Sequence, residues 1–230
     1  MDSLPNNKRE RFAKLLDDNA DLKTAVLNNP ELAGSWNKLD DLGIADETIA
    51  VLNKLDETKR VQLNSALDNS VFTDIARDYP GVVNALVTDK GSRPDPRTYL
   101  DEAYIANHLS NFSDGGSRIV LKETYLTRGV GKPDPGKTEF VSTKAEIDEI
   151  LQLPLDEQAT KLGIPIEQIQ GGGLVRIDFK PTDKIGIPSG NEFGANDLWI
   201  PGGKLPEGNL EAVVKTEGMQ INVDYFVMEL

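Results

Sequence analysis

The sequence contains no cysteine and a single histidine, His108. Without cysteine the chain can form neither a disulfide bond nor a thiolate metal site. One histidine also excludes the usual zinc ligand sets, which combine several imidazoles and thiolates. We therefore expect neither a disulfide-stabilised fold nor a zinc site of the usual kind.

Long apolar runs are also missing. No stretch of 18 or more apolar residues occurs, so we expect no membrane-spanning helix. The N-terminal residues MDSLPNNKRERFAKLL lack the apolar stretch of a cleavable signal peptide, although a fragment of a longer chain would look the same.

Basic residues are scarce relative to acidic ones. The 230 residues carry 25 lysines and arginines against 38 aspartates and glutamates, a net charge of −13. Residues 1–97 hold 13 basic and 17 acidic side chains (−4), and residues 98–230 hold 12 and 21 (−9). An acidic surface repels the phosphate backbone, so nucleic acid is disfavoured as the main partner.

The chain divides into two parts with different hydrophobic patterns. Residues 6–90 repeat apolar side chains at helical spacing, which predicts a small helical bundle that acts as a packing or delivery module. Gly91, Pro94 and Pro96 then break the helical pattern. We therefore place a domain boundary here, with a helical module and its linker over 1–97 and a catalytic domain over 98–230.

The second part begins with a predicted helix, 99–112, and continues with short strands. We expect one further helical stretch, 144–163, and strands over 118–125, 138–143, 173–179, 198–200, 210–216 and 219–230. Helices followed by strands indicate an α+β fold: a helical bundle, then a mixed, mainly antiparallel β domain with peripheral helices. The glycine-containing segment 128–137 lacks the spacing of a phosphate-binding loop and is interpreted as a hairpin-like loop.

Three polar positions stand at the ends of these strands, where functional sites often lie beside loops. Arg118 begins the first strand, Ser142 and Thr143 end the second, and Glu211 follows an irregular loop that starts at Ile187. A loop of this length without secondary structure is usually functional, so we expect it to position Glu211. Taken singly, each residue also has a structural interpretation; Ser142 or Thr143, for example, can cap the next helix.

In this order, the three positions resemble the mono-ADP-ribosyltransferase toxins. An arginine on the first strand, a strand ending in Ser-Thr (EFVSTK, 139–144) and a Glu-led strand that turns at Gly218 (NLEAVVKTEGMQINV, 209–223) match the layout of that family. The resemblance covers about residues 99–230 and implies the ADP-ribosyltransferase fold, with NAD as substrate and no metal.

The resemblance also implies roles for individual residues. Glu211 would stabilise the oxocarbenium-like state formed when the nicotinamide–ribose bond breaks, with Ser142 orienting the site. Arg118 would grip phosphate in a bidentate manner, which makes Arg118, Ser142 and Glu211 the catalytic set. NAD-binding positions would be Arg118, Ser142, Thr143, Trp199 and Asn196; Trp199 is equally consistent with a buried core position.

A second resemblance concerns the whole chain. A helical region followed by a domain that ends in PSGNEFGANDLWIPGG is similar to the C-terminal toxin modules of bacterial polymorphic toxins. This implies a secreted or injected effector that acts in the cytoplasm of a target cell. It also implies a cognate immunity protein and a protein or other acceptor in that cell.

Asn209 departs from the pattern of arginine-modifying members, which carry a glutamate two residues before the catalytic one. The acceptor is therefore open, and water as acceptor would make the protein an NAD glycohydrolase. Two other functions remain as alternatives. One is a metal-independent ribonuclease toxin that uses His108, lysine or arginine, and the other is a binding module without enzymatic activity.

Overall fold

The computed structural model describes residues 4–131 and 137–230, so the centre of the predicted 128–137 loop, residues 132–136, lies outside the described part. The chain forms two compact units. We call the residues up to Leu100, together with Ile200–Gly202, the helical unit. Asp101–Trp199 and Gly203–Leu230 form the sheet unit.

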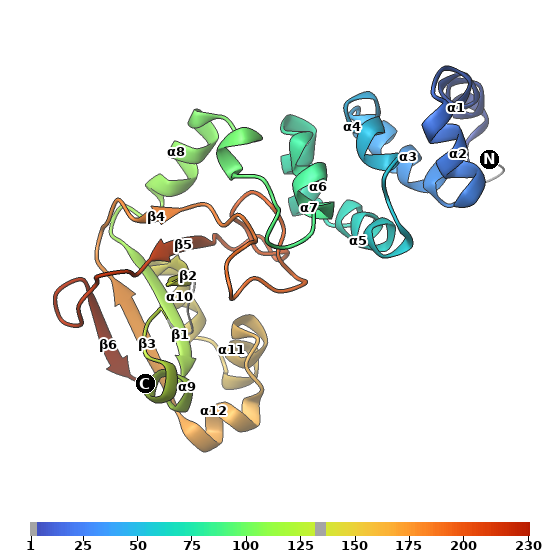
Figure 1. The fold of residues 1–230 in the computed structure, drawn as a ribbon. Helices are drawn as coiled ribbons and strands as arrows, with labels where there is room; N and C mark the ends of the chain where they lie inside the picture. The colour runs from blue at the N-terminus through green and yellow to red at the C-terminus, as the bar shows by residue number, and fades with distance from the viewer. Residues whose placement is uncertain (1–3, 132–136) are drawn as a thin grey trace. The chain divides into compact units, whose positions relative to one another are not determined.

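The helical unit consists of short helices joined by tight turns (Figure 1). They are α1 (Asn6–Asp18), α2 (Ala20–Asn28), α3 (Leu32–Asp41), α4 (Ala45–Leu52), α5 (Glu57–Leu67), α6 (Ser70–Asp78) and α7 (Gly81–Val87), followed by the 3-10 turn η1 (Pro96–Thr98). Three of them begin at a side-chain cap, from Asn19, Asp56 and Asn69. These caps accept otherwise unpaired N–H groups of the first turn, which explains why such short helices start where they do.

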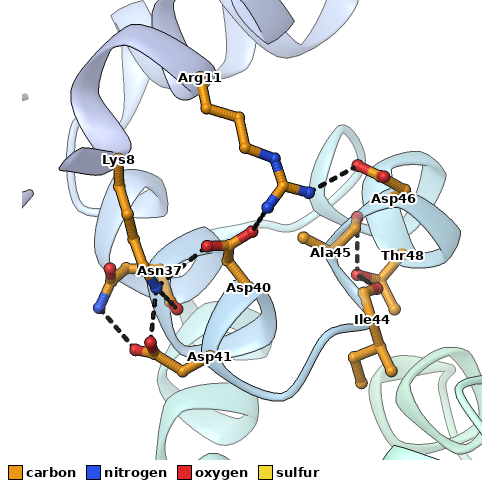
Figure 2. Close-up of polar contacts among 9 residues, drawn as sticks. All are labelled: Lys8, Arg11, Asn37, Asp40, Asp41, Ile44, Ala45, Asp46 and Thr48. Atoms are coloured by element: carbon orange, nitrogen blue, oxygen red, sulfur yellow. Dashed lines mark hydrogen bonds and ion pairs between the residues drawn. The ribbon is translucent and has the colours of Figure 1, made fainter.

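A polar cluster links α1 to α3 beside the core of this unit (Figure 2). The Asp40 carboxylate is 6% exposed and forms ion pairs with Lys8, at 3.0 Å, and with Arg11. Two cations compensate the cost of burying this carboxylate. Phe12 and Trp36, both fully buried, pack against each other with ring centroids 4.6 Å apart and ring planes tilted by 36°. The cluster therefore secures packing, and we assign it no chemistry.

The sheet unit contains one six-stranded, entirely antiparallel sheet in the order β4-β5-β2-β1-β3-β6. Its strands are β1 (Gly116–Leu121), β2 (Thr138–Thr143), β3 (Leu174–Phe179), β4 (Ile185–Gly186), β5 (Ala212–Lys215) and β6 (Tyr225–Glu229). Its helices are α8 (Glu102–Ser110), α9 (Lys122–Arg128), α10 (Lys144–Leu151), α11 (Leu155–Leu162) and α12 (Ile166–Gly172). Twelve α-helices and this sheet, in the described residues, confirm the α+β class.

Each face of the sheet carries its own core. On one face Val141, Ile177, Phe179 and Val214 pack with Phe112, which follows α8. On the other face, strand residues such as Ile119 and Leu174 pack against α10, α11 and α12, which lie on this side in Figure 1. The alternation of side chains along a strand assigns neighbouring residues to opposite cores.

One predicted strand is too long at its C-terminal end, and another predicted strand does not form. The strand predicted over 118–125 ends at Leu121, and Lys122–Arg128 forms α9, because this segment is rich in good helix formers. No strand forms at 198–200. There the Asn196 side chain accepts the Leu198 N–H at 2.9 Å, and its carbonyl accepts the Trp199 N–H, so the chain turns.

Other boundaries also differ from expectation. The helix predicted over 144–163 is split at Pro154 into α10 and α11, since proline cannot continue a helix, and α12 is additional. The last strand begins only at Tyr225, because Asn222 has a positive φ of 63° and residues 220–224 form a turn. The predicted 210–216 strand covers Ala212–Lys215.

Candidate functional site

The two central strands of the sheet pair over a short distance and then separate. β1 and β2 are in register at Gly116–Thr143 and Ser117–Ser142, whereas β1 stays paired with β3 from Ser117 to Leu121. On its other side β2 pairs with β5, ending at Val141–Ala212. Glu211 directly precedes Ala212, so this register brings it beside Ser142.

A pocket of about 130 Å³ lies where β1 and β2 separate. Arg118, Ser142 and Glu211, the three residues that the sequence singles out, all line it. Ile147 and Ile150 of α10 contribute an apolar wall. The structure therefore places on one pocket three residues that are separated by up to 93 positions in the chain, from Arg118 to Glu211.

The Arg118 guanidinium is held by a carboxylate that sequence reasoning missed. Arg118 forms an ion pair with Glu139 of β2, whose side chain is 6% exposed and also accepts the Gly131 N–H at 2.7 Å. The contact uses Nη1 of Arg118, whose side chain remains 36% exposed. Glu139 thus orients the guanidinium, while Nε and Nη2 have no side-chain partner among residues 4–131 and 137–230 and can donate to a ligand. A buried glutamate within TEFVST has no sequence signal that distinguishes it from a solvent-facing one.

The backbone around Glu211 is fixed at three points. Its N–H donates to the Gly203 carbonyl at 2.8 Å, and its carbonyl accepts from His108 Nε2 at 2.9 Å. The preceding N–H, of Leu210, donates to Glu146 at 2.8 Å. The loop before Glu211 folds back through a bridge between Lys204 and Leu210. A carboxylate on such a fixed backbone can be presented to a ligand in one orientation.

Glu211 is electrostatically unusual. Burial is the main cause that raises its pKa to about 7; the nearby charge of Glu192 raises it further, and Arg118 opposes the rise. Burial also lowers the pKa of Arg118, with the charge of Arg128 adding to this effect and Glu211 opposing it. A partly buried acid beside a charge partner in a pocket is typical of a functional group.

Ser142 and Thr143 have separate roles. Thr143 is the N-cap of α10: its hydroxyl accepts the Glu146 N–H at 3.2 Å and donates to the Glu146 carboxylate at 2.8 Å. Its hydroxyl is thereby engaged away from any ligand, which matches the capping interpretation. Ser142 lines the pocket, and its hydroxyl has no side-chain hydrogen bond to the residues that the structure describes.

Glu146 connects the cap of α10 to the segment before Glu211. One carboxylate oxygen of Glu146 accepts a hydrogen bond from the Thr143 hydroxyl. The other accepts hydrogen bonds from the Leu210 N–H and, at 3.5 Å, from the Asn209 side-chain amide. The residues Thr-Lys-Ala-Glu at 143–146 form the S/T-x-x-E capping-box pattern, so the sequence did carry a signal for this residue. The contact of Glu146 with Leu210, over 60 residues away in the chain, had no signal in the sequence.

His108 is buried, with 4% exposure, and its Nε2–H donates to the Glu211 carbonyl. Burial lowers its pKa, and the charge of Lys204 adds to this, against the raising effects of the Glu211 carbonyl and Glu146. Gly203 (φ +75°) lies against the ring, and a Cβ there would come within 2.7 Å of Nε2. This position favours a structural role for His108.

Trp199 and Asn196, expected to bind NAD, are placed differently from the other candidates. Trp199 is buried, at 4% exposure, and Asn196 is exposed and shapes the turn before it. Neither is among the described residues that line the pocket. Lys161 of α11 and Asn209 do line it, although the sequence offered no reason to select Lys161.

The described residues contain neither a cluster of metal-binding side chains nor a helix that could cross a membrane. Within the ranges 4–131 and 137–230, no group of three or more His, Asp or Glu side chains is arranged to hold a metal ion. No helix of these ranges combines the length and apolar character needed to cross a membrane.

Comparison of the chain with protein-family models, with curated proteins and with solved structures gives no match.

Proposed function

We propose that the sheet unit cleaves the nicotinamide–ribose bond of NAD and transfers the ADP-ribosyl group to an acceptor. The observation that carries this proposal is the convergence of Arg118, Ser142 and Glu211 on one pocket. A carboxylate, a hydroxyl and an arginine are the groups that this reaction requires, and it needs neither metal nor thiol.

Glu211 supplies the electrostatic part of the chemistry. When the glycosidic bond breaks, positive charge develops on the ribose ring, and an adjacent carboxylate stabilises it. The partly buried position of Glu211 strengthens that interaction, since charges attract more strongly where water is excluded. Arriving substrate carries a positive nicotinamide ring, which favours the ionised carboxylate.

Arg118 and Ser142 position the substrate. Glu139 holds the guanidinium so that its remaining N–H donors can bind the diphosphate, and Lys161 offers a second cation at the pocket wall. The pocket volume of about 130 Å³ is below the roughly 300 Å³ of sites that enclose whole ligands. It suits one end of the substrate, the nicotinamide–ribose, with the remainder extending outward.

Asn209 favours an acceptor other than arginine. It lines the pocket and its amide contacts Glu146, at the position where the resembled arginine-modifying enzymes carry glutamate. An amide cannot accept the proton of a guanidinium nucleophile as a carboxylate does. The second candidate function is therefore NAD glycohydrolysis, in which water attacks at the same site.

The biological setting belongs to the same proposal. The resemblance to polymorphic toxins supports an effector that is delivered into a target cell and restrained by an immunity protein. The ribonuclease alternative gains nothing from His108, whose Nε2–H is engaged with the Glu211 carbonyl. The acidic balance of the chain also disfavours RNA as substrate.

The test is incubation of the full chain with NAD while released nicotinamide and ADP-ribose are quantified by chromatography. Glu211→Gln should lower turnover about 10²–10³-fold, because it keeps the shape and removes the charge. Arg118→Ala should mainly raise KM by removing the phosphate contact. Exposed Glu149→Gln on α10 is the matched control for the first substitution and should retain wild-type rates.

Two outcomes would count against the proposal. No nicotinamide release, with or without a lysate as a source of acceptors, would contradict NAD cleavage. Wild-type turnover in both Glu211→Gln and Arg118→Ala would contradict the assigned site. Release of free ADP-ribose in buffer alone, equal to nicotinamide, would select the glycohydrolase over the transferase.

A further inference from the structure

Three polar side chains lie in a row across the middle of the sheet. Ser117 of β1 stands between Ser142 of β2 and Asp178 of β3, because it is in register with both of them. Side chains that are directly opposite each other on paired strands share one face of the sheet. Ser117 and Ser142 line the pocket, and Asp178 lies behind them on the side of β3.

The Ser117 hydroxyl is fully buried and is engaged on the side of Asp178. It donates to Asp178 Oδ1 at 2.6 Å and accepts from Arg176 Nε at 3.1 Å. A hydroxyl that donates to a carboxylate at this distance makes a charge-assisted bond, which is roughly twice as strong as a neutral one. A serine hydroxyl has a single proton, so the proton of Ser117 is held away from Ser142.

Arg176 fixes the carboxylate that receives this proton. Its Nε donates to Asp178 Oδ1 at 2.7 Å, and its Nη1 forms an ion pair with Asp148 of α10. The side chains of Arg176 and Asp178 are only 11% and 17% exposed. A guanidinium on one side and a hydroxyl on the other compensate the cost of burying the Asp178 carboxylate. The acceptor of the Ser117 proton is therefore held in place.

Ser142 keeps its hydroxyl free under this arrangement. That hydroxyl has no side-chain hydrogen bond within residues 4–131 and 137–230, although Ser117 stands directly opposite. The Cβ atoms of such a pair are about 4.5–5.5 Å apart, which is close enough for one hydroxyl to donate to the other. Without Asp178, the buried Ser117 O–H would need another acceptor, because buried donors are almost always paired. The Ser142 oxygen stands opposite it on the other side.

We propose that Asp178 is a positioning residue of the pocket: by holding the proton of Ser117, it leaves the Ser142 hydroxyl available to a ligand. Asp178 touches no substrate and acts through the two serines. This inference deepens the NAD-cleaving function proposed above and rests on it wherever turnover is measured. The conformation of Ser142 is a separate readout that needs no substrate.

Asp178→Ala in the full chain tests this role. The Ser117 hydroxyl should turn to Ser142, and NAD must then displace it. The KM for nicotinamide release should rise about fivefold, the effect of one neutral hydrogen bond, with kcat unchanged. In a Ser117→Ala background the same substitution should leave KM where that background has it, because no hydroxyl competes for Ser142. Asp148→Ala, which removes the other carboxylate on Arg176, is the matched control and should retain the wild-type KM.

Nuclear magnetic resonance gives two readouts without substrate. In the wild-type chain the Ser117 hydroxyl proton should exchange slowly with water, because it is buried and bonded to Asp178. The three-bond couplings that report χ1 of Ser142 should change in Asp178→Ala and return toward wild-type values in the double variant with Ser117→Ala.

A rise in KM that is equally large in the Ser117→Ala background would overturn the inference, since Asp178 would then act on the fold and not through Ser117. Rapid exchange of the Ser117 hydroxyl proton in the wild type would overturn it even if Asp178→Ala failed to fold. Absence of nicotinamide release by the wild type, together with the expected change at Ser142, would refute the proposed NAD cleavage and support the role of Asp178.

Discussion

Replacing Glu211 by glutamine should stabilise the fold while it removes the proposed activity. Burial raises the pKa of Glu211 from 4.5 to about 7, with Glu192 adding to the effect. The unfolded chain ionises this carboxyl near its ordinary value. Between these two pH values the unfolded state therefore binds fewer protons than the folded state, and the free energy of unfolding falls as pH rises. Well above pH 7 this carboxyl is ionised in both states, and its effect on the free energy of unfolding no longer changes with pH.

The size of the effect follows from the two pKa values. At about 1.4 kcal/mol per pH unit, an ordinary value of 4.5 and a folded value of about 7 cost the native state about 1.4 kcal/mol at pH 5.5 and about 3 kcal/mol at pH 8. These two free energies are upper limits, because the Glu211 side chain keeps some contact with solvent, which screens its charge. Glutamine has the shape of the protonated acid and carries no such cost, so the advantage of Glu211→Gln should grow by up to about 2 kcal/mol over this range.

Urea unfolding of the full chain at pH 5.5 and pH 8 measures this difference. The helical unit is identical in both proteins, so its contribution cancels when the variant is compared with the wild type. Glu149→Gln, on the exposed surface of α10, controls for the general loss of one negative charge. The stability advantage of Glu211→Gln over the wild type should differ between the two pH values. An equal advantage at both, or a Glu211→Gln variant less stable than wild type at pH 8, would refute the reasoning that Glu211 is a desolvated acid.

Four further substitutions follow from the same geometry. If ionised Glu211 is the active form, kcat/KM for nicotinamide release should rise about tenfold between pH 6 and pH 8, and Glu192→Gln should move the midpoint to lower pH. An unmoved midpoint would exclude Glu192 as a cause. Gly203→Ala should cost roughly 1–3 kcal/mol in urea unfolding, because φ is +75° and the added Cβ meets His108. Combining it with His108→Ala should cost less than the sum of both single changes, and full additivity would contradict this contact. Glu146→Ala should cost about 1–3 kcal/mol and lower kcat, because it releases the segment before Glu211. Unchanged values of both quantities would show that this link is dispensable.

The sequence alone determined the class of the fold and the three main pocket positions. Helical periodicity before residue 90 and alternation after residue 115 are local patterns, and local patterns suffice to separate helices from strands. Arg118, Ser142 and Glu211 were found because each stands at the end of a predicted element, where turns and polar side chains coincide. The capping-box spacing from Thr143 to Glu146 is local as well and could have been read in advance.

Only the tertiary structure decided how these positions meet. The separation of β1 from β2, which opens the pocket, depends on pairing between segments far apart in the chain, and no local pattern encodes that register. Glu139 and His108 became partners of Arg118 and Glu211 for the same reason. The pKa of Glu211 depends on burial and on charges brought near by folding, which is why its position could be predicted from sequence and its acidity could not.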